Sequence, residues 1–450
     1  MALTGIEIFK KLPKTNCGEC GVPTCLAFAM KLAAGQAELS ACPYVSEEAK
    51  AALEEASAPP IRPVVIGTGD KALKIGGETV MFRHEKRFVN PTGIAVLVTD
   101  KMNEAEVDKR LKKLNELKFE RVGLILQADL VAVKGESGDP AQFETLVKKV
   151  KEKLDGKGMV LMSEDPKVLS AGAKACADRK PLLYAATKAN ADAMAGLAKE
   201  ISAPLAVKGN SLDELAELTT KLTAAGLKDL VLDSGARTPK KLLEDQIIMR
   251  RAALMKKFRP LGFPTITFPC AMTTDPMKET LLASMLVAKY GGIVVLSDLE
   301  GHSLFPLLLE RMNIYTDPQR PMATTEGIYE IGGPGENSPV LITSNFSLTS
   351  FIVSGEIEGS RIPSWLLVKD TEGLSVMTAW AAGKFGADVI APFVKKCGIA
   401  DKVKHRKLII PGYAAVISGE LEEELPDWQV LIGPREAGHI PAYIRMWKPE

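Results

Sequence analysis

The sequence predicts an α/β protein with three parts: a small cysteine-rich unit, a central closed (β/α)8 TIM barrel, and a third α/β unit. Four of the seven cysteines fall within the first 42 residues. From residue 93, short apolar segments and amphipathic helical segments alternate eight times, which is the count of a closed barrel. A boundary rich in proline and glycine at 314–338 then precedes four further strand candidates.

The composition is that of a globular protein without a charged partner surface. The 450 residues are 46% hydrophobic and 25% charged, and this length predicts about three domains. The formal net charge is only +1, so no basic excess favours nucleic acid or anionic lipid. No apolar run is long enough for a membrane helix, and the N-terminus has no secretion pattern. We therefore expect a cytoplasmic protein that binds neither nucleic acid nor membrane.

The domain boundaries follow from these shifts in pattern. We predict a metal-binding domain at 1–58, a linker at 59–92, the barrel at 93–325 and a last domain at 326–450. The first domain should contain a helix before Cys17 and further helices at Cys25–Ala34 and Ser46–Glu55. A unit this small needs a bound metal for stability.

The clustered cysteines, Cys17, Cys20, Cys25 and Cys42, have the spacing C-x2-C-x4-C-x16-C. Zinc is commonly held by two paired cysteine knuckles. An iron–sulfur cubane takes closely spaced thiolates from one loop and a ligand from further away. Three cysteines within nine residues and a distant fourth favour the cubane, with structural zinc or free thiols as the alternatives. The scattered cysteines are interpreted as buried small hydrophobic residues.

The barrel is predicted from eight strand candidates, with an open doubly wound sheet as the alternative. The strands are Ile94–Thr99, Val122–Gln127, Met159–Ser163, Leu182–Ala185, Leu205–Lys208, Leu230–Asp233, Thr265–Phe268 and Ile293–Ser297. Helices are expected at Glu104–Leu117, Pro140–Leu154, Leu212–Ala225 and Pro239–Phe258, among others. The strand ends carry no metal triad, paired carboxylates or phosphate loop, and Asp233–Ala236 reads as a capped turn. The barrel therefore reads as a scaffold.

The third unit combines four strand candidates with loops that suit a ligand. The strands are Val340–Thr343, Trp365–Lys369, Lys407–Ile410 and Gln429–Leu431, and the helices are Leu374–Ala382, Ala387–Lys396, Tyr413–Leu421 and Ala437–Met446. Loops follow at Lys369–Gly373, Pro411–Gly412 and Ile432–Gly438. Such loops at the carboxyl ends of parallel strands bind ligands, although ordinary turns are the alternative. None is a nucleotide motif, and no histidine-based corrinoid motif D-x-H-x-x-G is present.

Taken together, these parts resemble the large subunit of the corrinoid/iron–sulfur protein of anaerobic acetyl-CoA synthesis, over nearly the whole chain. The stretches that carry the resemblance are Leu12–Met30, Cys42–Val45, Arg179–Ala185, Thr343–Leu348, Asp370–Ser375, Ile410–Pro411 and Val430–Glu436. The resemblance implies an N-terminal [4Fe–4S] domain, a TIM barrel and a C-terminal Rossmann-like α/β domain that binds corrinoid. It also implies Cys17, Cys20, Cys25 and Cys42 as the cluster ligands.

The corrinoid contacts are implied residue by residue. Thr371, in the loop of Asp370, Thr371, Glu372 and Gly373 with the adjoining Leu374, would lie under the cobalt without bonding it. Val340, Thr343, Asn345 and Phe346 would line the wall beside it, and Gly412, Gly433, Pro434 and Arg435 would hold the corrin amides and the nucleotide tail. The cobamide would be base-off with no protein histidine ligand, which eases reduction of its cobalt.

The implied function is that of a methyl carrier rather than an enzyme. The cobalt would accept a methyl group from methyltetrahydrofolate through a separate methyltransferase and pass it to acetyl-CoA synthase. The cluster would return an electron when Co(II) must be reduced to Co(I). The partners would be a small subunit in a heterodimer, the methyltransferase, acetyl-CoA synthase and a reductive activator. The rival interpretations are a barrel that binds a pterin and transfers methyl itself, and a redox or structural module without corrinoid.

Overall fold

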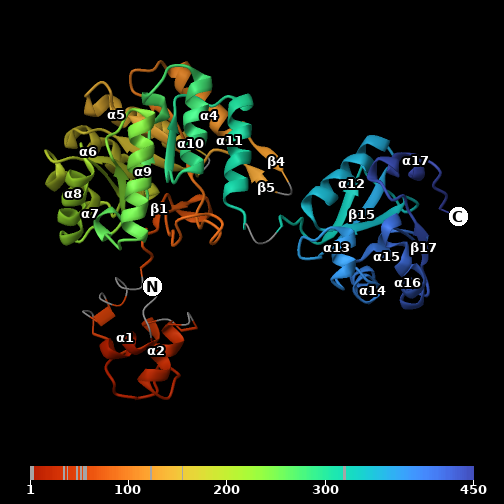
Figure 1. The fold of residues 1–450 in the computed structure, drawn as a ribbon. Helices are drawn as coiled ribbons and strands as arrows, with labels where there is room; N and C mark the ends of the chain where they lie inside the picture. Colours follow the sequence, from red (N-terminus) through yellow and green to blue (C-terminus); the bar gives the residue numbers. More distant parts are fainter. Residues whose placement is uncertain are drawn as a thin grey trace.

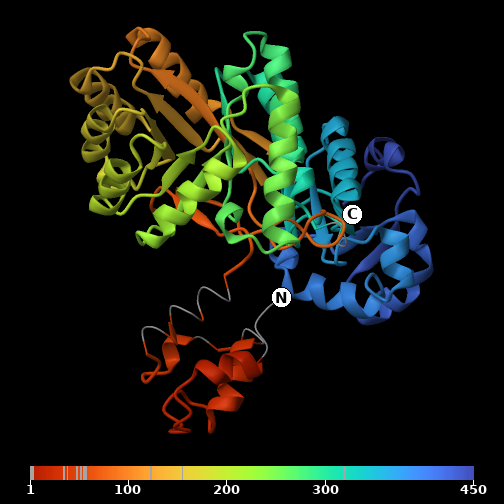
Figure 2. The ribbon, with the colours of Figure 1, turned by 60° about the vertical axis from the view of Figure 1, so that its left-hand side comes forward.

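The computed structural model describes residues 5–33, 36–37, 39–46, 49–50, 53, 58–121, 124–154, 156–317 and 321–449. Figure 1 shows an N-terminal unit, a central barrel and a C-terminal α/β unit that follow one another along the chain. In the turned view the N-terminal unit again stands apart, and the C-terminal unit partly overlaps the barrel in projection (Figure 2). Within the described residues, none of the helices has the length and apolarity needed to cross a membrane.

The N-terminal unit is built on two short helices, α1 (Gly5–Lys11) and α2 (Cys25–Ala33), followed by the 3-10 turn η1 (Leu39–Ala41). Ile8 from α1 and Phe28 from α2 are buried in its small core, with Leu53 from further along the chain. Most of the helix expected at Ser46–Glu55 lies outside the described residues.

The segment 59–92, expected to be a linker, contains the antiparallel strands β1 (Val64–Ile66) and β2 (Leu73–Ile75). Ile66 and Ile75 are fully buried in the core inside the barrel. The N–H of Gly67 donates to the carbonyl of Lys180, which lies just before a barrel strand. The hairpin therefore fills the amino-terminal end of the barrel and shares its core.

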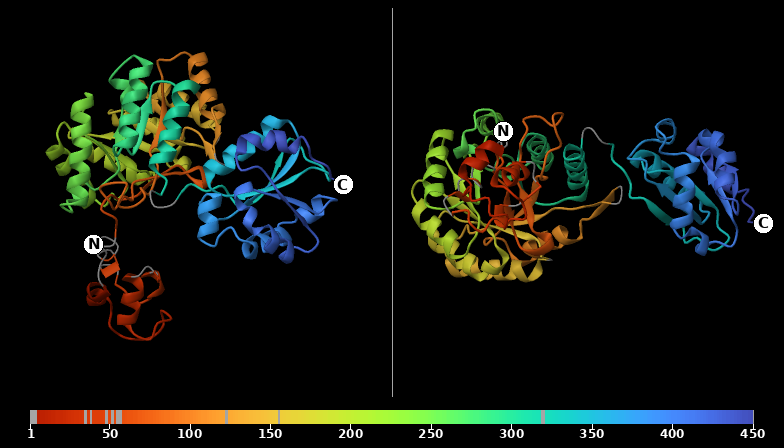
Figure 3. Two further views of the ribbon diagram at one scale, coloured as in Figure 1. Left: turned by 45° about the vertical axis from the view of Figure 1, so that its right-hand side comes forward. Right: turned by 90° about the horizontal axis from the view of Figure 1, so that it is seen from below.

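The barrel contains eight parallel strands, which Figure 3 shows ringed by helices. They are β3 (Gly93–Thr99), β6 (Leu130–Lys134), β7 (Gly158–Met162), β8 (Leu182–Ala186), β9 (Leu205–Lys208), β10 (Leu230–Asp233), β11 (Ile266–Thr267) and β12 (Ile293–Leu296). A parallel bridge between Leu232 and Thr265 joins the two edge strands. This bridge closes the ring, so the open-sheet alternative is wrong.

One predicted strand is wrong. The segment Val122–Gln127 was expected as the second barrel strand, but Leu124–Leu126 forms β5, which pairs antiparallel with β4 (Phe119–Arg121) in a projecting hairpin. Leu124 and Ile125 are more than half exposed there. The barrel strand is instead β6, which begins after Asp129, whose carboxylate accepts the Ile94 N–H and pairs with Arg311. The second strand end is accordingly Lys134 and not Gln127.

The barrel helices begin where the sequence supplies N-caps. Asn103, Asp139 and Asp165 each accept a backbone N–H of the first turn of the helix that follows, which satisfies donors that would otherwise lack partners. The helices are α4 (Glu104–Glu116), α5 (Pro140–Lys153), α6 (Pro166–Ala175), α7 (Ala191–Glu200), α8 (Leu212–Ala224), α9 (Pro239–Leu254), α10 (Pro276–Ala288) and α11 (Gly301–Ile314). The four helix ranges predicted here agree with the structure to within a few residues.

The C-terminal unit is a five-stranded sheet with the order β13-β15-β14-β16-β17. The strands are β13 (Gly327–Ile331), β14 (Val340–Ser344), β15 (Ser364–Lys369), β16 (Lys407–Ile410) and β17 (Gln429–Ile432). Four are parallel, and β13, which was not predicted, is an antiparallel edge. After β14 the chain adds β15 on one side of it and then crosses to add β16 on the other side. The strand order therefore reverses between β14 and β16, and such a switch point opens a crevice at the carboxyl ends of the strands.

Helices cover both faces of this sheet and bury two separate apolar clusters. They are α12 (Ser347–Ser360), α13 (Val376–Ala381), α14 (Ala387–Lys396), α15 (Ile399–Lys402), α16 (Ser418–Glu424) and α17 (Ile440–Ile444). The helix α12 was not predicted. The last two predicted helices begin instead as the 3-10 segments η6 (Gly412–Ile417) and η7 (Ala437–His439).

Candidate cofactor sites

The loop between α1 and α2 carries three of the four clustered cysteines. Cys25 is the first residue of α2 and is buried, Cys20 is half-buried, and Cys17 is exposed. The loop is wound by residues with positive φ, among them Gly18 and Gly21, where a side chain would be strained. The Asn16 side chain accepts the N–H of Cys25 at 2.8 Å, and the Asn16 N–H points at Cys25 Sγ at 3.4 Å. The loop thus supplies thiols together with an N–H directed at sulfur.

The fourth cysteine is brought to the same loop by its neighbour. Tyr44 donates its hydroxyl to Glu19 Oε1 at 2.8 Å, across 25 residues of sequence. This hydrogen bond, followed by the charge of Glu19, raises the pKa of Tyr44. Cys20 and Cys42 also pack against one small core. The sequence segments 17–20 and 42–44 are therefore adjacent.

The donor set fits a cluster in its chemistry. Four thiols on one small unit, with an N–H directed at one sulfur, are the ligands and the outer-shell contact that iron–sulfur sites use. Among the described residues, no group of three or more cysteine, histidine or acidic side chains stands at metal-binding distance. A cluster held by these four thiols would need them closer together than they stand here.

The remaining cysteines have a different environment. Burial raises the pKa of the Cys176 thiol to about 12 and that of the Cys270 thiol to about 12. Burial also raises the pKa of Cys397. These thiols stay protonated at neutral pH. Cys176 is buried, as expected, whereas Cys270 and Cys397 are half-buried.

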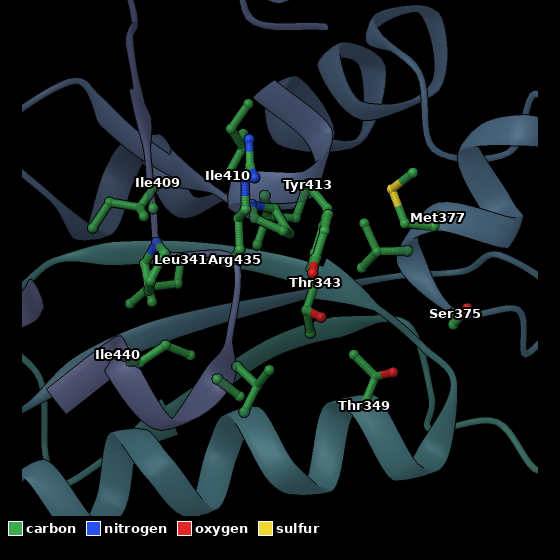
Figure 4. A pocket seen from close by; sticks show the side chains of 17 residues that line it. Leu341, Thr343, Thr349, Ser375, Met377, Ile409, Ile410, Tyr413, Arg435 and Ile440 are labelled. Carbon is green, nitrogen blue, oxygen red and sulfur yellow. The ribbon is translucent and has the colours of Figure 1, made fainter. Parts of the chain in front are cut away.

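A cavity of about 240 Å³ lies at the switch point between β14 and β16. Its walls are largely aliphatic, and Figure 4 shows the hydroxyl-bearing Thr343, Thr349 and Ser375 along one side. The residues that line it are Leu341, Ile342, Thr343, Thr349, Val353, Ser375, Val376, Met377, Ile409, Ile410, Pro411, Tyr413, Gly433, Pro434, Arg435, Ala437 and Ile440. In this described part of the chain, Thr343 Oγ1 is buried and lacks a hydrogen-bond partner. A ligand that supplies a polar atom would satisfy it.

Beside the cavity, the loop at 370–374 is organised by Asn345. Asn345 Oδ1 lies 3.0 Å from the N–H of Thr371, 3.0 Å from the N–H of Gly373 and 2.9 Å from Thr371 Oγ1. Its Nδ2 donates to Asp370 at 2.8 Å. Glu372 and Gly373 have positive φ, which turns the loop back on itself. Thr371 is only 1% exposed, so its hydroxyl is committed within the loop.

Backbone hydrogen bonds from two glycines hold the loops after β16 and β17 against each other. The Gly412 N–H donates to Pro434 at 3.0 Å, and the Gly433 N–H donates to Ile410 at 2.9 Å. A Cβ on Gly412 would lie 2.6 Å from the carbonyl oxygen of Gly433. These two amides therefore donate to the protein's own backbone. The glycines are needed because the two loops approach each other too closely for a side chain. Arg435 is exposed at the rim, with its guanidinium 5.9 Å from the Tyr413 ring.

The structure thus separates the predicted corrinoid contacts into two groups. Thr343, Gly433, Pro434 and Arg435 line the cavity, whereas Val340, Asn345, Phe346, Gly412 and the residues from Asp370 to Leu374 lie around or behind it. Reasoning from sequence missed the contributions of Thr349 and Val353, because α12 was not predicted. The spacing of four between these two residues is the pattern that could have revealed this helix face.

A polar cluster also lies at the carboxyl end of the barrel strands. Asp233 accepts hydrogen bonds from Tyr184 Oη at 2.6 Å, from Arg237 at 3.0 and 2.7 Å, and from the Gly235 N–H at 2.9 Å. Arg237 also lies 5.0 Å from the Phe268 ring. The pKa of Tyr184 is raised well above its ordinary value. Burial is the largest cause, and the charge of the Asp233 carboxylate is the second. The capped turn expected at Asp233–Ala236 is therefore present, and Asp233 also forms an ion pair with Arg237.

We expect Asp233→Asn to destabilise the barrel by about 3 kcal/mol, because it leaves the Arg237 guanidinium without its counter-charge. Asp192→Asn is the matched control, since Asp192 pairs with Lys221 on the surface and its side chain is 84% exposed. The control should cost less than about 0.5 kcal/mol. Urea unfolding monitored by circular dichroism measures both, and equal costs would contradict a structural role for the Asp233 cluster.

Known proteins match this combination over the full chain. A family model described as "CO dehydrogenase/acetyl-CoA synthase delta subunit" matches residues 63–444, and one described as "Putative Fe-S cluster" matches residues 12–44. The corrinoid/iron-sulfur protein large subunit of Moorella thermoacetica is 50% identical over 445 residues, with 99% of each chain covered. Acetyl-CoA decarbonylase/synthase complex subunit gamma of Methanopyrus kandleri is 38% identical, with 98% of this chain and 97% of the relative covered. Subunit gamma 2 of Methanosarcina thermophila is 39% identical, with 99% of each covered.

Fold and sites define an α/β subunit with a thiol loop at one end and a switch-point cavity at the other. The chain belongs to the family of corrinoid/iron–sulfur protein large subunits, together with the gamma subunits of the acetyl-CoA decarbonylase/synthase complex.

Proposed function

We propose that this chain is the corrinoid-bearing subunit of a methyl carrier in acetyl-CoA synthesis. The observation that carries the proposal is the cavity at the carboxyl edge between β14 and β16, with the unpartnered Thr343 hydroxyl in its wall. The switch point of a mostly parallel sheet is where such domains bind cofactors. A relative at 50% identity is named a corrinoid/iron-sulfur protein.

The C-terminal unit is proposed as a Rossmann-like corrinoid-binding domain at 326–450. At about 240 Å³ the cavity suits a side arm or the nucleotide tail, and the corrin ring would cover its mouth. The exposed apolar side chains of Leu348, Met377, Trp380, Tyr413 and Val416 surround this end of the sheet and would meet the ring. Because no histidine is among the lining residues, the proposal is a base-off cobamide without a protein histidine ligand.

The residues have distinct proposed roles. Thr343, Gly433, Pro434 and Arg435 would contact the tail and the amides of the ring. The loop of Asp370, Thr371, Glu372 and Gly373, with Leu374, would face the underside of the ring. Val340, Asn345, Phe346 and Gly412 would hold these segments in place from behind, as their hydrogen bonds and packing favour.

The two cofactors would divide the chemistry. When bound, the corrinoid supplies a cobalt that takes a methyl group from methyltetrahydrofolate through a methyltransferase and passes it to acetyl-CoA synthase. A [4Fe–4S] cluster on Cys17, Cys20, Cys25 and Cys42, within residues 1–58, would supply the electron that restores Co(I) from Co(II). The barrel, taken as 93–325, would hold the two ends of the chain, with 59–92 as its connection to the cluster unit.

The proposed partners follow from this role. A relative named as a large subunit supports a small subunit in a heterodimer, and names that contain acetyl-CoA decarbonylase/synthase support docking to that enzyme. A methyltransferase and a reductive activator complete the proposed set. The interior of the barrel gives the enzyme alternative little support, because Asp233 is already bound to Tyr184 and Arg237.

A methyl-transfer assay separates a carrier from an enzyme. The heterodimer is first reduced to the Co(I) state with a low-potential one-electron reductant. It is then mixed anaerobically with methyltetrahydrofolate labelled in its methyl group, with or without a corrinoid methyltransferase, and protein-bound label is counted. We expect label on the heterodimer only when the methyltransferase is present. Equal labelling without the methyltransferase would support the pterin-binding enzyme instead, and no labelling in either case would contradict both.

A further inference from the structure

The connector that leads from the barrel into the C-terminal sheet runs along the base of the cavity loops. The segment 321–326, here called the connector, lies antiparallel beside residues 345–347, with a bridge between Ala323 and Phe346. The Thr324 N–H donates to the carbonyl of Asn345 at 2.8 Å. The Ser347 N–H donates to the carbonyl of Met322 at 3.0 Å. The connector is therefore paired with the segment that contains Asn345.

The connector also touches the 370–374 loop directly. Glu326 Oε2 accepts the Asp370 N–H at 2.7 Å and pairs with Lys369 at the end of β15. Gly373 lies so close to the connector that a Cβ on it would be 2.9 Å from the carbonyl oxygen of Pro321. Asn345 completes the arrangement, since its side chain accepts the Thr371 and Gly373 amides. Both ends of the loop are thus held by the connector, directly or through Asn345.

We propose that the connector is a positioning element for the 370–374 loop, with Glu326 as its principal contact. Through Glu326 and Asn345, the path of the chain between barrel and sheet sets the backbone of the loop that carries Thr371. Neither residue lines the cavity, so both act through the loop. The effect of this positioning on a cofactor rests on the proposed function, because it requires a corrinoid at this site. The contact between the connector and the loop is observed independently of that proposal.

A second anchor lies on the barrel side. Arg83 donates to the carbonyls of Asn313 at 2.8 Å and Ile314 at 2.9 Å, and to Thr316 Oγ1 at 3.1 Å. Five peptide links separate Thr316 from Pro321, which limits their separation to about 18 Å. A displacement of the C-terminal sheet beyond this reach must break one anchor. If the connector contacts break, the loop under the proposed ring loses its support.

Amide hydrogen exchange of the corrinoid-free heterodimer tests the contact. Glu326→Ala removes the acceptor for the Asp370 N–H, and we expect exchange in a peptide that covers 370–376 to rise about tenfold. Glu326→Gln keeps an acceptor oxygen and should restore most of the protection. Glu330→Ala is the matched control, because Glu330 lies on the adjoining edge strand β13 and its side chain pairs only with the surface Lys402 in the described contacts. Wild-type exchange in Glu326→Ala would overturn the proposal.

The corrinoid-loaded protein gives an independent readout. With cobalt content unchanged, we expect Glu326→Ala to alter the Co(II)/Co(I) midpoint potential, and Glu326→Gln and Glu330→Ala to retain the wild-type potential. An unchanged potential in Glu326→Ala would overturn the positioning role. If wild-type protein binds no cobalt, the proposed function fails, yet the exchange experiment still decides whether the connector holds the loop.

Discussion

Cys25→Ser is expected to remove the iron–sulfur cluster, so that iron falls from about four atoms per chain to less than about one. Cys25 is the buried member of the cysteine set and lies in the core of the N-terminal unit, where Asn16 contacts both its N–H and its sulfur. A serine oxygen is a poor substitute for a thiolate ligand of iron. Because metal binding and folding are coupled in units this small, protease resistance of residues 1–58 should fall with the iron. Iron analysis and limited proteolysis measure both effects.

Cys397→Ser is the matched control for this variant. Cys397 follows α14 in the C-terminal unit, with its Sγ at 3.5 Å from the carbonyl of Val394. This variant should retain full iron. Full iron in Cys25→Ser, or equal loss in both variants, would remove Cys25 from the ligand set. Zinc in place of iron in wild-type protein would return the site to the structural-zinc alternative.

Gly412→Ala is expected to weaken corrinoid binding at least tenfold, which corresponds to about 1.4 kcal/mol. The new Cβ would lie 2.6 Å from the Gly433 carbonyl oxygen and 2.8 Å from the backbone nitrogen of Arg435. Both contacts are with backbone, so the loops after β16 and β17 must move apart. Gly433, Pro434 and Arg435 line the cavity, and the movement therefore alters the wall proposed to hold the cofactor. Titration of corrinoid-free heterodimer with cobamide, followed by its visible spectrum, measures the affinity.

Gly419→Ala provides the comparison. Gly419 lies on α16, and a Cβ there meets nothing within 4 Å. The Gly419→Ala substitution should leave corrinoid affinity unchanged, since alanine also favours a helix. Similar affinity for Gly412→Ala and wild type would show that the corrinoid does not depend on the loops after β16 and β17.

The barrel could be predicted from sequence because its strands are buried on both sides. Continuous apolar runs such as Leu182–Ala186 and Leu230–Leu232 mark such strands, and seven of the eight predicted barrel strands coincide with observed ones. The prediction of the second barrel strand was wrong because two apolar runs lie close together in the sequence. Leu124–Leu126 and Leu130–Lys134 both have strand composition, and only burial against the barrel distinguishes them.

The C-terminal site was predicted in part. The loops after β15, β16 and β17 could be placed because short parallel strands end at one edge of a sheet. Helix α12 was missed because Ser347–Ser360 carries serine, threonine and glycine, which are weak helix formers, and tertiary packing against β14 overrides this preference. The connector contacts with Asn345 and Asp370 join segments more than twenty residues apart, and no local pattern predicts them.

The most direct test of the account is metal analysis of this chain purified anaerobically with its small subunit. The account predicts about one cobalt and about four iron atoms per chain, with corrinoid bands in the visible spectrum. Iron without cobalt would contradict the methyl-carrier proposal and leave a redox module in its place. Zinc without iron would contradict the assignment of Cys17, Cys20, Cys25 and Cys42 as cluster ligands.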